Sequence, residues 1–142
     1  MATYEDLVKC GYLEMKLPRK QRKMTQKVWK RKWFVLRRRS KYGQTRLEYY
    51  HSEKACIDNR HKTIIPLCGV RNIDNVHSRT HQHAFQIAAP EIRIFLSGDN
   101  RLDTDEWVRL MKELVLPEPK MFPSVEGGDI FVTNSRPEDK DS

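Results

Sequence analysis

The chain has 142 residues, of which 38% are hydrophobic and 32% are charged, and its formal net charge at pH 7 is +8. This length suits one domain with some additional chain, because domains of about 100–150 residues are the commonest. No run of ~18 apolar residues is present, so the sequence excludes a transmembrane helix. Residues 1–6 have neither a basic flank nor an apolar stretch, and we therefore expect no signal peptide.

Four short strands are predicted in the first half of the chain, because apolar and polar residues alternate and β-branched and aromatic residues are frequent. These strands cover residues 11–17, 29–36, 46–50 and 63–67. In the second of them, Lys30 and Lys32 fall on the same face as Phe34 and Leu36. A barrel would turn that face inward, and two unpaired lysines cannot be buried in a core. We therefore expect Lys30 and Lys32 where the strand reaches an open end.

Positive charge is concentrated in residues 15–41, which contain thirteen Lys and Arg residues and no acidic residue. The rest of the chain has 14 basic and 19 acidic residues, a net charge of −5. Such a segment suits an anionic partner, which can be phospholipid headgroups, nucleic acid or an acidic protein. The alternative is a solvated basic face without a partner, but the absence of any compensating acid favours a partner.

The second half of the chain predicts three more strands, at residues 70–76, 83–88 and 92–96, and then a helix. The helical spacing i, i+3, i+4, i+7 is occupied by Trp107, Leu110, Met111 and Leu114. Asp103 is predicted to cap the helix, with Glu106 completing a capping box and Leu102 packing onto Trp107. This apolar stripe predicts a helix that covers one end of a small barrel.

The composition changes after residue 116. Residues 117–142 contain four of the seven prolines and have a net charge of −3. Residues 129–133 could form one strand, which would not be stable alone. We expect residues 1–7 to be an N-terminal tail, 8–116 to be the folded domain and 117–142 to be an acidic linker.

The order of these elements resembles the pleckstrin homology domain, a mainly β fold. That family has a seven-stranded barrel of two near-orthogonal antiparallel sheets, capped by one C-terminal α-helix. The matching segments are Gly11-Tyr12-Leu13 in the first strand, Trp29-Lys30-Arg31-Lys32-Trp33-Phe34-Val35-Leu36 in the second, Ile64-Ile65-Pro66-Leu67 in the fourth, and Asp105-Glu106-Trp107 in the helix. The resemblance covers roughly residues 8–116.

A narrower resemblance comes from Arg46-Leu47-Glu48-Tyr49-Tyr50 followed by Ser52-Glu53-Lys54. This string is similar to the third strand of the insulin receptor substrate and downstream-of-tyrosine-kinase (Dok) adaptors. In those adaptors a phosphotyrosine-binding domain follows the pleckstrin homology domain. Phe131-Val132-Thr133, with Arg136-Pro137-Glu138 after it, resembles the opening strand of the Dok phosphotyrosine-binding domain. The resemblance implies that residues 117–142 lead into such a domain, and that an activated receptor tyrosine kinase is a partner through it.

The pleckstrin resemblance implies a phosphoinositide headgroup site at the open end of the barrel. The residues predicted to form it are Lys16, Arg19, Lys20, Arg22, Lys23, Lys30, Lys32 and Tyr49. The sequence departs from the family's high-affinity pattern at two positions. Met15 replaces a basic residue late in the first strand, and Lys32 replaces an arginine, which would hold phosphate with two parallel hydrogen bonds. We expect membrane attraction with little selectivity among phosphoinositides.

Two function classes follow from these features. The first is a non-catalytic adaptor module that recruits its protein to anionic, phosphoinositide-containing membranes downstream of receptor tyrosine kinases. The second is a protein-interaction module that binds an acidic or phosphorylated partner and has only weak lipid contact. Trp29 and Trp33 interleave with the basic residues, but no nucleic-acid motif is present, and we do not expect nucleic acid as the partner.

No catalytic residues, metal site or cofactor are predicted. His81 and His83 lie two apart beside a predicted turn without a third ligand at metal-binding spacing, and no nucleophile–base arrangement or phosphate-binding glycine loop is visible. Cys10, Cys56 and Cys68 are odd in number and widely spaced, which argues against a disulfide framework. We expect a monomer that is cytoplasmic and peripheral at the inner face of the plasma membrane.

Overall fold

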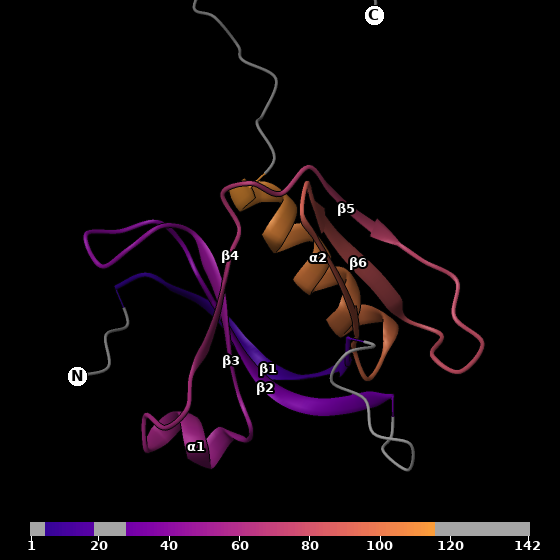
Figure 1. Ribbon diagram of the computed structural model, residues 1–142, viewed down its shortest axis with the longest axis horizontal. Helices are drawn as coiled ribbons and strands as arrows, with labels where there is room; N and C mark the ends of the chain where they lie inside the picture. The colour runs from indigo at the N-terminus through magenta and orange to yellow at the C-terminus, as the bar shows by residue number, and fades with distance from the viewer. Residues whose placement is uncertain (1–4, 19–27, 116–142) are drawn as a thin grey trace, which may run out of the picture.

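The computed structural model describes residues 5–18 and 28–115, which form seven antiparallel strands, a short helix and a long C-terminal helix (Figure 1). The strands are β1 (Leu7–Lys16), β2 (Trp29–Arg37), β3 (Arg46–Tyr50), β4 (Thr63–Pro66), β5 (Asn72–Asn75), β6 (Ala84–Ala89) and β7 (Ile92–Ser97). The helices are α1 (Glu53–Ile57) and α2 (Arg101–Val115). The mainly β fold with seven strands and a C-terminal helix is confirmed.

The seven strands are hydrogen-bonded into one sheet in the order β4-β3-β2-β1-β7-β6-β5. Its two halves, which the sequence analysis treated as two sheets, are joined where β1 pairs with β7. That pairing covers only two residue pairs, Glu14 with Ser97 and Met15 with Leu96. In Figure 1 the half formed by β1–β4 and the half formed by β5–β7 face each other across the interior. The sheet therefore bends at β1 and encloses a core.

The core consists of the side chains on the inner face of the bent sheet and the buried face of α2. The predicted alternation in the first strand is confirmed, because Leu13, Met15 and Leu17 are all buried. Phe34 and Leu36 of β2 are fully buried beside them. Directly opposite residues in a β-ladder lie on the same face, so the register of β1 against β2 fixes which β2 side chains point inward.

Helix α2 covers one end of this core with Thr104, Trp107, Val108 and Met111. Its start differs from the prediction. Asn100 is the capping residue, because its Oδ1 accepts a hydrogen bond of 2.8 Å from the backbone N–H of Asp103. The prediction that Asp103 caps the helix and Leu102 packs onto Trp107 was wrong: the helix begins three residues earlier, and Leu102 is 85% exposed.

Two further features differ from the sequence analysis. The fold includes Asp6, which is fully buried, and Leu7, the first residue of β1, both of which were assigned to an N-terminal tail. Helix α1 was not predicted; its cap is Ser52, whose hydroxyl accepts a hydrogen bond of 3.1 Å from the N–H of Ala55. In Figure 1, α1 lies at the bottom, away from α2.

None of the described helices combines the length and apolarity needed to cross a membrane. The predicted linker at residues 117–142 lies outside the described residues.

Candidate functional site

Lys30 and Lys32 lie on the inner face of β2. Lys30 is directly opposite Met15, and Lys32 is directly opposite Leu13, which is fully buried. Pairing of β2 with β3 covers only Trp33 to Arg37, so both lysines are on the part of β2 that extends past the end of β3. They lie where the sequence analysis placed them, on an inward face at the end of a strand.

This end of the barrel is the one that α2 does not cover. The ring of Trp107 in α2 lies against the start of β1, since a Cβ at Gly11 would be 3.6 Å from its Cζ2 atom. The other end is formed by the end of β1 and the start of β2, together with the end of β3 and the start of β4. We call it the open end.

The charges of Lys30 and Lys32 are not neutralised by the described part of the protein. Neither ammonium group has a carboxylate within 4.0 Å among residues 5–18 and 28–115. Both side chains are half-buried. Burial, together with the neighbouring charge of Lys30, lowers the pKa of Lys32 below its ordinary value. A bound anion would offset both effects.

At the opposite end of the same inner face, Lys9 is fully neutralised. Its Nζ lies 3.0 Å from Asp103 Oδ1 and 2.6 Å from Glu106 Oε1. It also lies 5.2 Å from the centroid of the Trp107 ring. Burial alone would lower the pKa of Lys9, but the two carboxylates hold this pKa above its ordinary range. These acidic residues therefore fasten α2 to β1.

Five other cations of the basic segment that the structure describes lie on the outer face of β2 or beyond its far end. Arg31 points outward, with its Nη1 at 2.9 Å from Asp99 Oδ1. Arg37 is paired with Asp6 and Glu48 on the outer face of the sheet. Residues 38–41 follow the end of β2 that is farthest from the open end. Only part of the positive charge of residues 15–41 therefore lies at the open end.

Two other predicted site residues are described by the structure, one on the inner face and one on the outer face. Tyr49 of β3 is opposite Phe34, with ring centroids 5.3 Å apart, and opposite Thr63 of β4, so it shares their inner face. Lys16 is opposite Trp29 on the outer face, and its Nζ lies 5.4 Å from the centroid of the Phe95 ring. The remaining predicted residues, Arg19, Lys20, Arg22 and Lys23, lie outside the described residues.

A cavity of about 530 Å³ adjoins the open end, and the sequence analysis did not predict it. Its lining comes from the end of β1, Tyr49, the edge strand β4 and the first half of β7, and includes Arg93. The available sequence signal was the alternation of Ile92 and Ile94 within the strand predicted at residues 92–96. Nothing in the local pattern indicates that β4 and β7, almost thirty residues apart, face each other.

A family model described as the pleckstrin homology domain matches residues 7–114. The chain belongs to the pleckstrin homology domain family. Family membership places it among non-catalytic modules that bind lipids or proteins in signalling adaptors.

Among curated proteins, insulin receptor substrate 2-A and 2-B of Xenopus laevis are each 28% identical to this pleckstrin homology domain, over 119 and 116 residues. These matches cover 80% and 78% of the chain but only 10% of each relative. The chain thus spans about a tenth of the length of these relatives. They support the predicted likeness to insulin receptor substrates, while the likeness to Dok adaptors stays a prediction.

Solved structures support the same fold. The C-terminal domain of pleckstrin, solved in complex with an inositol pentakisphosphate, is 20% identical with a TM-score of 0.57, covering 77% of this chain and 98% of that one. The domain of human pleckstrin homology domain-containing protein family A member 5 is 24% identical with a TM-score of 0.55, covering 85% and 87%.

The structure also shows what the departure from the family pattern at Met15 means. Met15 is buried and lies between Lys30 on β2 and Leu96 on β7, so no basic side chain replaces the missing one from the inner face of β1. Lys16, the adjacent cation, is on the opposite face. In the described part of this pleckstrin homology domain, the inner face of the open end therefore has two lysines and the Tyr49 hydroxyl for an anion.

Proposed function

We propose that this pleckstrin homology domain recruits its protein to anionic, phosphoinositide-containing membranes at the inner face of the plasma membrane. The observation that carries the proposal is the pair Lys30 and Lys32. Both are half-buried on an inward face, and neither is paired with an acidic residue in the described chain. Two half-buried cations without acidic partners destabilise the free domain, and a bound anion reduces this destabilisation.

In this proposal the open end faces the membrane. Lys30 and Lys32 bind headgroup phosphate, Tyr49 donates a hydroxyl hydrogen bond, and Lys16 with the cations at residues 19–23 adds general attraction. At about 1 kcal/mol per basic residue near an anionic surface, five engaged residues give roughly 5 kcal/mol, a sub-millimolar affinity. Attachment is transient unless a second domain of the same protein adds avidity.

The cellular role follows from the relatives. We propose a docking function in receptor tyrosine kinase signalling, because the chain resembles the insulin receptor substrates over most of its own length. The link to a receptor would be made by a neighbouring domain, while the pleckstrin homology domain holds the protein at the membrane.

Vesicle co-sedimentation tests the membrane proposal. We expect binding to vesicles that contain phosphoinositides, a loss of binding in roughly 0.5 M salt, and a loss of at least tenfold in the double variant Lys30→Glu, Lys32→Glu. The matched control is Arg38→Glu, Arg39→Glu, which changes the net charge equally at the far end of β2 and should bind nearly as well as the wild type. Equal losses in both variants would contradict a site at the open end.

A headgroup titration followed by backbone amide chemical shifts separates this function from protein binding. The membrane proposal predicts shifts around Lys30, Lys32 and Tyr49. Shifts confined to α2, with none near Lys30, would instead support a module that binds an acidic or phosphorylated protein segment.

A further inference from the structure

The cavity beside the open end has a mainly apolar lining. Inner-face side chains from three parts of the chain meet in it, namely Leu17 of the β1–β2 connection, Ile65 of β4 and Ile94 of β7, with Pro18 and Pro66 beside them. Its volume of about 530 Å³ falls within the usual range for small-molecule sites. The polar groups in its lining include Lys16, Thr63 and Arg93.

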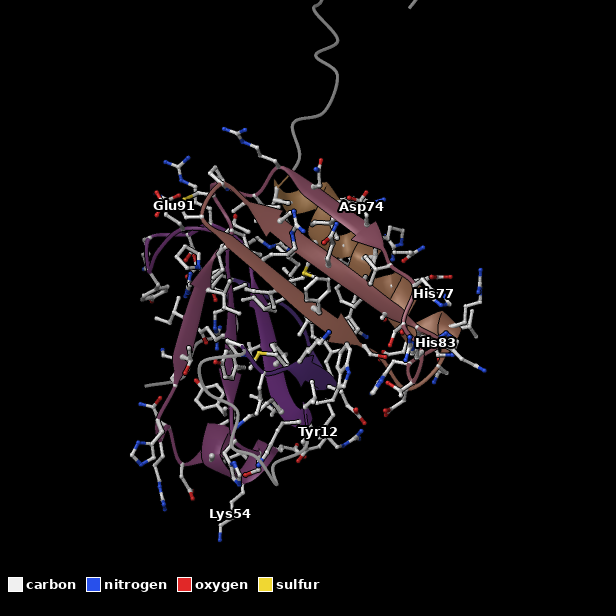
Figure 2. All side chains as sticks on the ribbon, turned by 45° about the vertical axis from the view of Figure 1, so that its right-hand side comes forward. Tyr12, Lys54, Asp74, His77, His83 and Glu91 are labelled. Carbon is white, nitrogen blue, oxygen red and sulfur yellow. The ribbon has the colours of Figure 1, made fainter. Side chains whose placement is uncertain are left out.

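The cavity exists because β1 and β7 are paired over a short distance only. Their ladder ends at Met15 and Leu96, so Ile92–Ile94 of β7 and the end of β1 are not joined by strand pairing. On the other side β4 is an edge strand of the sheet. Figure 2 shows the turn between β6 and β7, marked by Glu91, near one end of β4. The opening between these strands is lined by side chains and not closed by backbone hydrogen bonds.

Two large apolar side chains in this lining are unusually exposed. Ile92, on the inner face of β7, is 51% exposed, and Ile64, which lies opposite Glu48 on the outer face of β4, is 50% exposed. Removing exposed apolar side chains from water is favourable. An apolar occupant of the cavity would cover the exposed part of Ile92.

Cations accompany this apolar surface. Arg93 is exposed on the outer face of β7 and Lys16 lies on the outer face of β1, and both border the opening of the cavity. No carboxylate lies within 4.0 Å of either side chain in the described part of the chain. The cavity therefore combines an apolar interior with positive charge at its outer rim, which complements a molecule that has an apolar chain and an anionic group.

We propose that this cavity binds a single acyl chain of an anionic amphiphile, with the anionic group beside Lys16 and Arg93. The proposal goes beyond the headgroup recognition described above, since it assigns a separate site to the apolar part of a lipid. The chain is supplied either by a free lysolipid or by a lipid of the bilayer to which the domain is attached.

Isoleucine methyl groups give a direct test. The chain has eight isoleucines, of which Ile64, Ile65, Ile92 and Ile94 line the cavity, whereas Ile57, Ile73 and Ile87 do not. We expect 1-decanoyl lysophosphatidate, kept below its micelle concentration, to shift the four cavity methyl signals selectively. Glycerol 3-phosphate has the same anionic group without the chain and should leave them in place. Each added methylene should raise affinity about fourfold until the cavity is full.

Shifts limited to the exposed Ile64 and Ile92, with none at Ile65 and Ile94, would overturn the proposal, because they would indicate adsorption at the surface. Equal shifts of all isoleucines would overturn it too. Lipid nanodiscs identify the source of the chain: the same four shifts with nanodiscs indicate a bilayer lipid, and shifts with lysolipid alone indicate a free amphiphile.

A variant that fills the cavity provides the second test. Thr63 is exposed on β4 and lines the cavity, so Thr63→Trp should lower lysolipid affinity at least tenfold while the domain stays folded. The matched control is Asn72→Trp, at an exposed strand position outside this cavity, which should leave affinity unchanged. Unchanged affinity in Thr63→Trp would overturn the proposal.

The two proposals fail separately. The double variant Lys30→Glu, Lys32→Glu should lose phosphoinositide vesicle binding and keep chain-dependent shifts at Ile65 and Ile94. Loss of the chain-dependent shifts in that variant, with the fold intact, would mean that the cavity is not an independent site.

Discussion

Lys32 of β2 lies directly across the β1–β2 hairpin from Leu13 of β1, a side chain that is fully buried. A cation in this position loses water contacts and gains no acidic partner within the described chain. At the other end of the same inner face, Lys9 has two carboxylates within hydrogen-bonding distance. The electrostatic environment of Lys32 is therefore unfavourable in the free domain. Charged residues in such environments are frequently maintained for binding.

Removal of the Lys32 charge should stabilise the free domain. Lys32→Met keeps an unbranched side chain against Leu13 and removes the buried charge, so we expect the free energy of unfolding to rise by about 0.5–1 kcal/mol. Chemical denaturation measures this change, and vesicle binding should fall in the same variant. Lys9→Met is the control, because it leaves Asp103 and Glu106 without their partner and should lower stability. A loss of stability in Lys32→Met would contradict the electrostatic assignment.

Anion binding should weaken at alkaline pH. The lowered pKa of Lys32 means that the folded free domain releases this proton below the ordinary lysine pKa of about 10.4. Across that window the unfolded chain binds more protons, so stability rises with pH while attraction for an anion falls. Headgroup affinity measured between pH 7 and 10 tests this. Lys32→Arg stays charged and should lose less affinity over the same range; identical pH profiles would count against a role for Lys32 in the site.

The buried carboxylate of Asp6 should make the fold sensitive to acid. Its oxygens accept hydrogen bonds from Ser40 Oγ at 2.8 Å, Arg37 Nη1 at 2.8 Å and Arg46 Nη2 at 3.2 Å. Burial alone would raise the pKa of Asp6, but these donors hold it below its ordinary range. A lowered carboxyl pKa contributes stability that is complete above about pH 4 and is lost as pH falls through the lowered pKa.

The variant Asp6→Asn tests this contribution. At pH 7 it should lose about 3 kcal/mol of stability, because it breaks buried ion pairs, and the difference from wild type should shrink on acidification. Asp74→Asn, at an exposed position of β5, is the control and should change stability by less than about 0.5 kcal/mol. A difference between wild type and Asp6→Asn that stays constant down to pH 2 would disprove the assignment.

The approach of α2 to the end of β7 requires a glycine at position 98. A Cβ on Gly98 would overlap Oγ1 of Thr104 and lie 3.3 Å from its Cα. Thr104 is buried and donates a hydrogen bond of 2.8 Å to the carbonyl of Asn100, so it cannot move freely. We expect Gly98→Ala to cost about 1–3 kcal/mol by thermal denaturation. Gly69→Ala meets no atom within 4 Å and should be near neutral.

Much of the fold could be predicted because the strands alternate in their side chains. That alternation placed Lys30 and Lys32 on the face of Phe34, and the register confirms this arrangement. The start of α2 was predicted wrongly because Asp103 and Asn100 are both good capping residues and only the path of the chain selects between them. Asp6 was missed because all its partners lie more than thirty residues away in the sequence.

The net charge of +8, the order of the elements and the inward direction of two lysines were determined by the sequence itself, since charge and period-two alternation are local properties. Only the tertiary structure decided which cations are neutralised. Ion pairs such as Lys9 with Glu106 and Arg31 with Asp99 join residues 97 and 68 positions apart, and they depend on how the sheet bends at β1. The apolar cavity has the same origin, because it lies between strands that meet only once the barrel has formed.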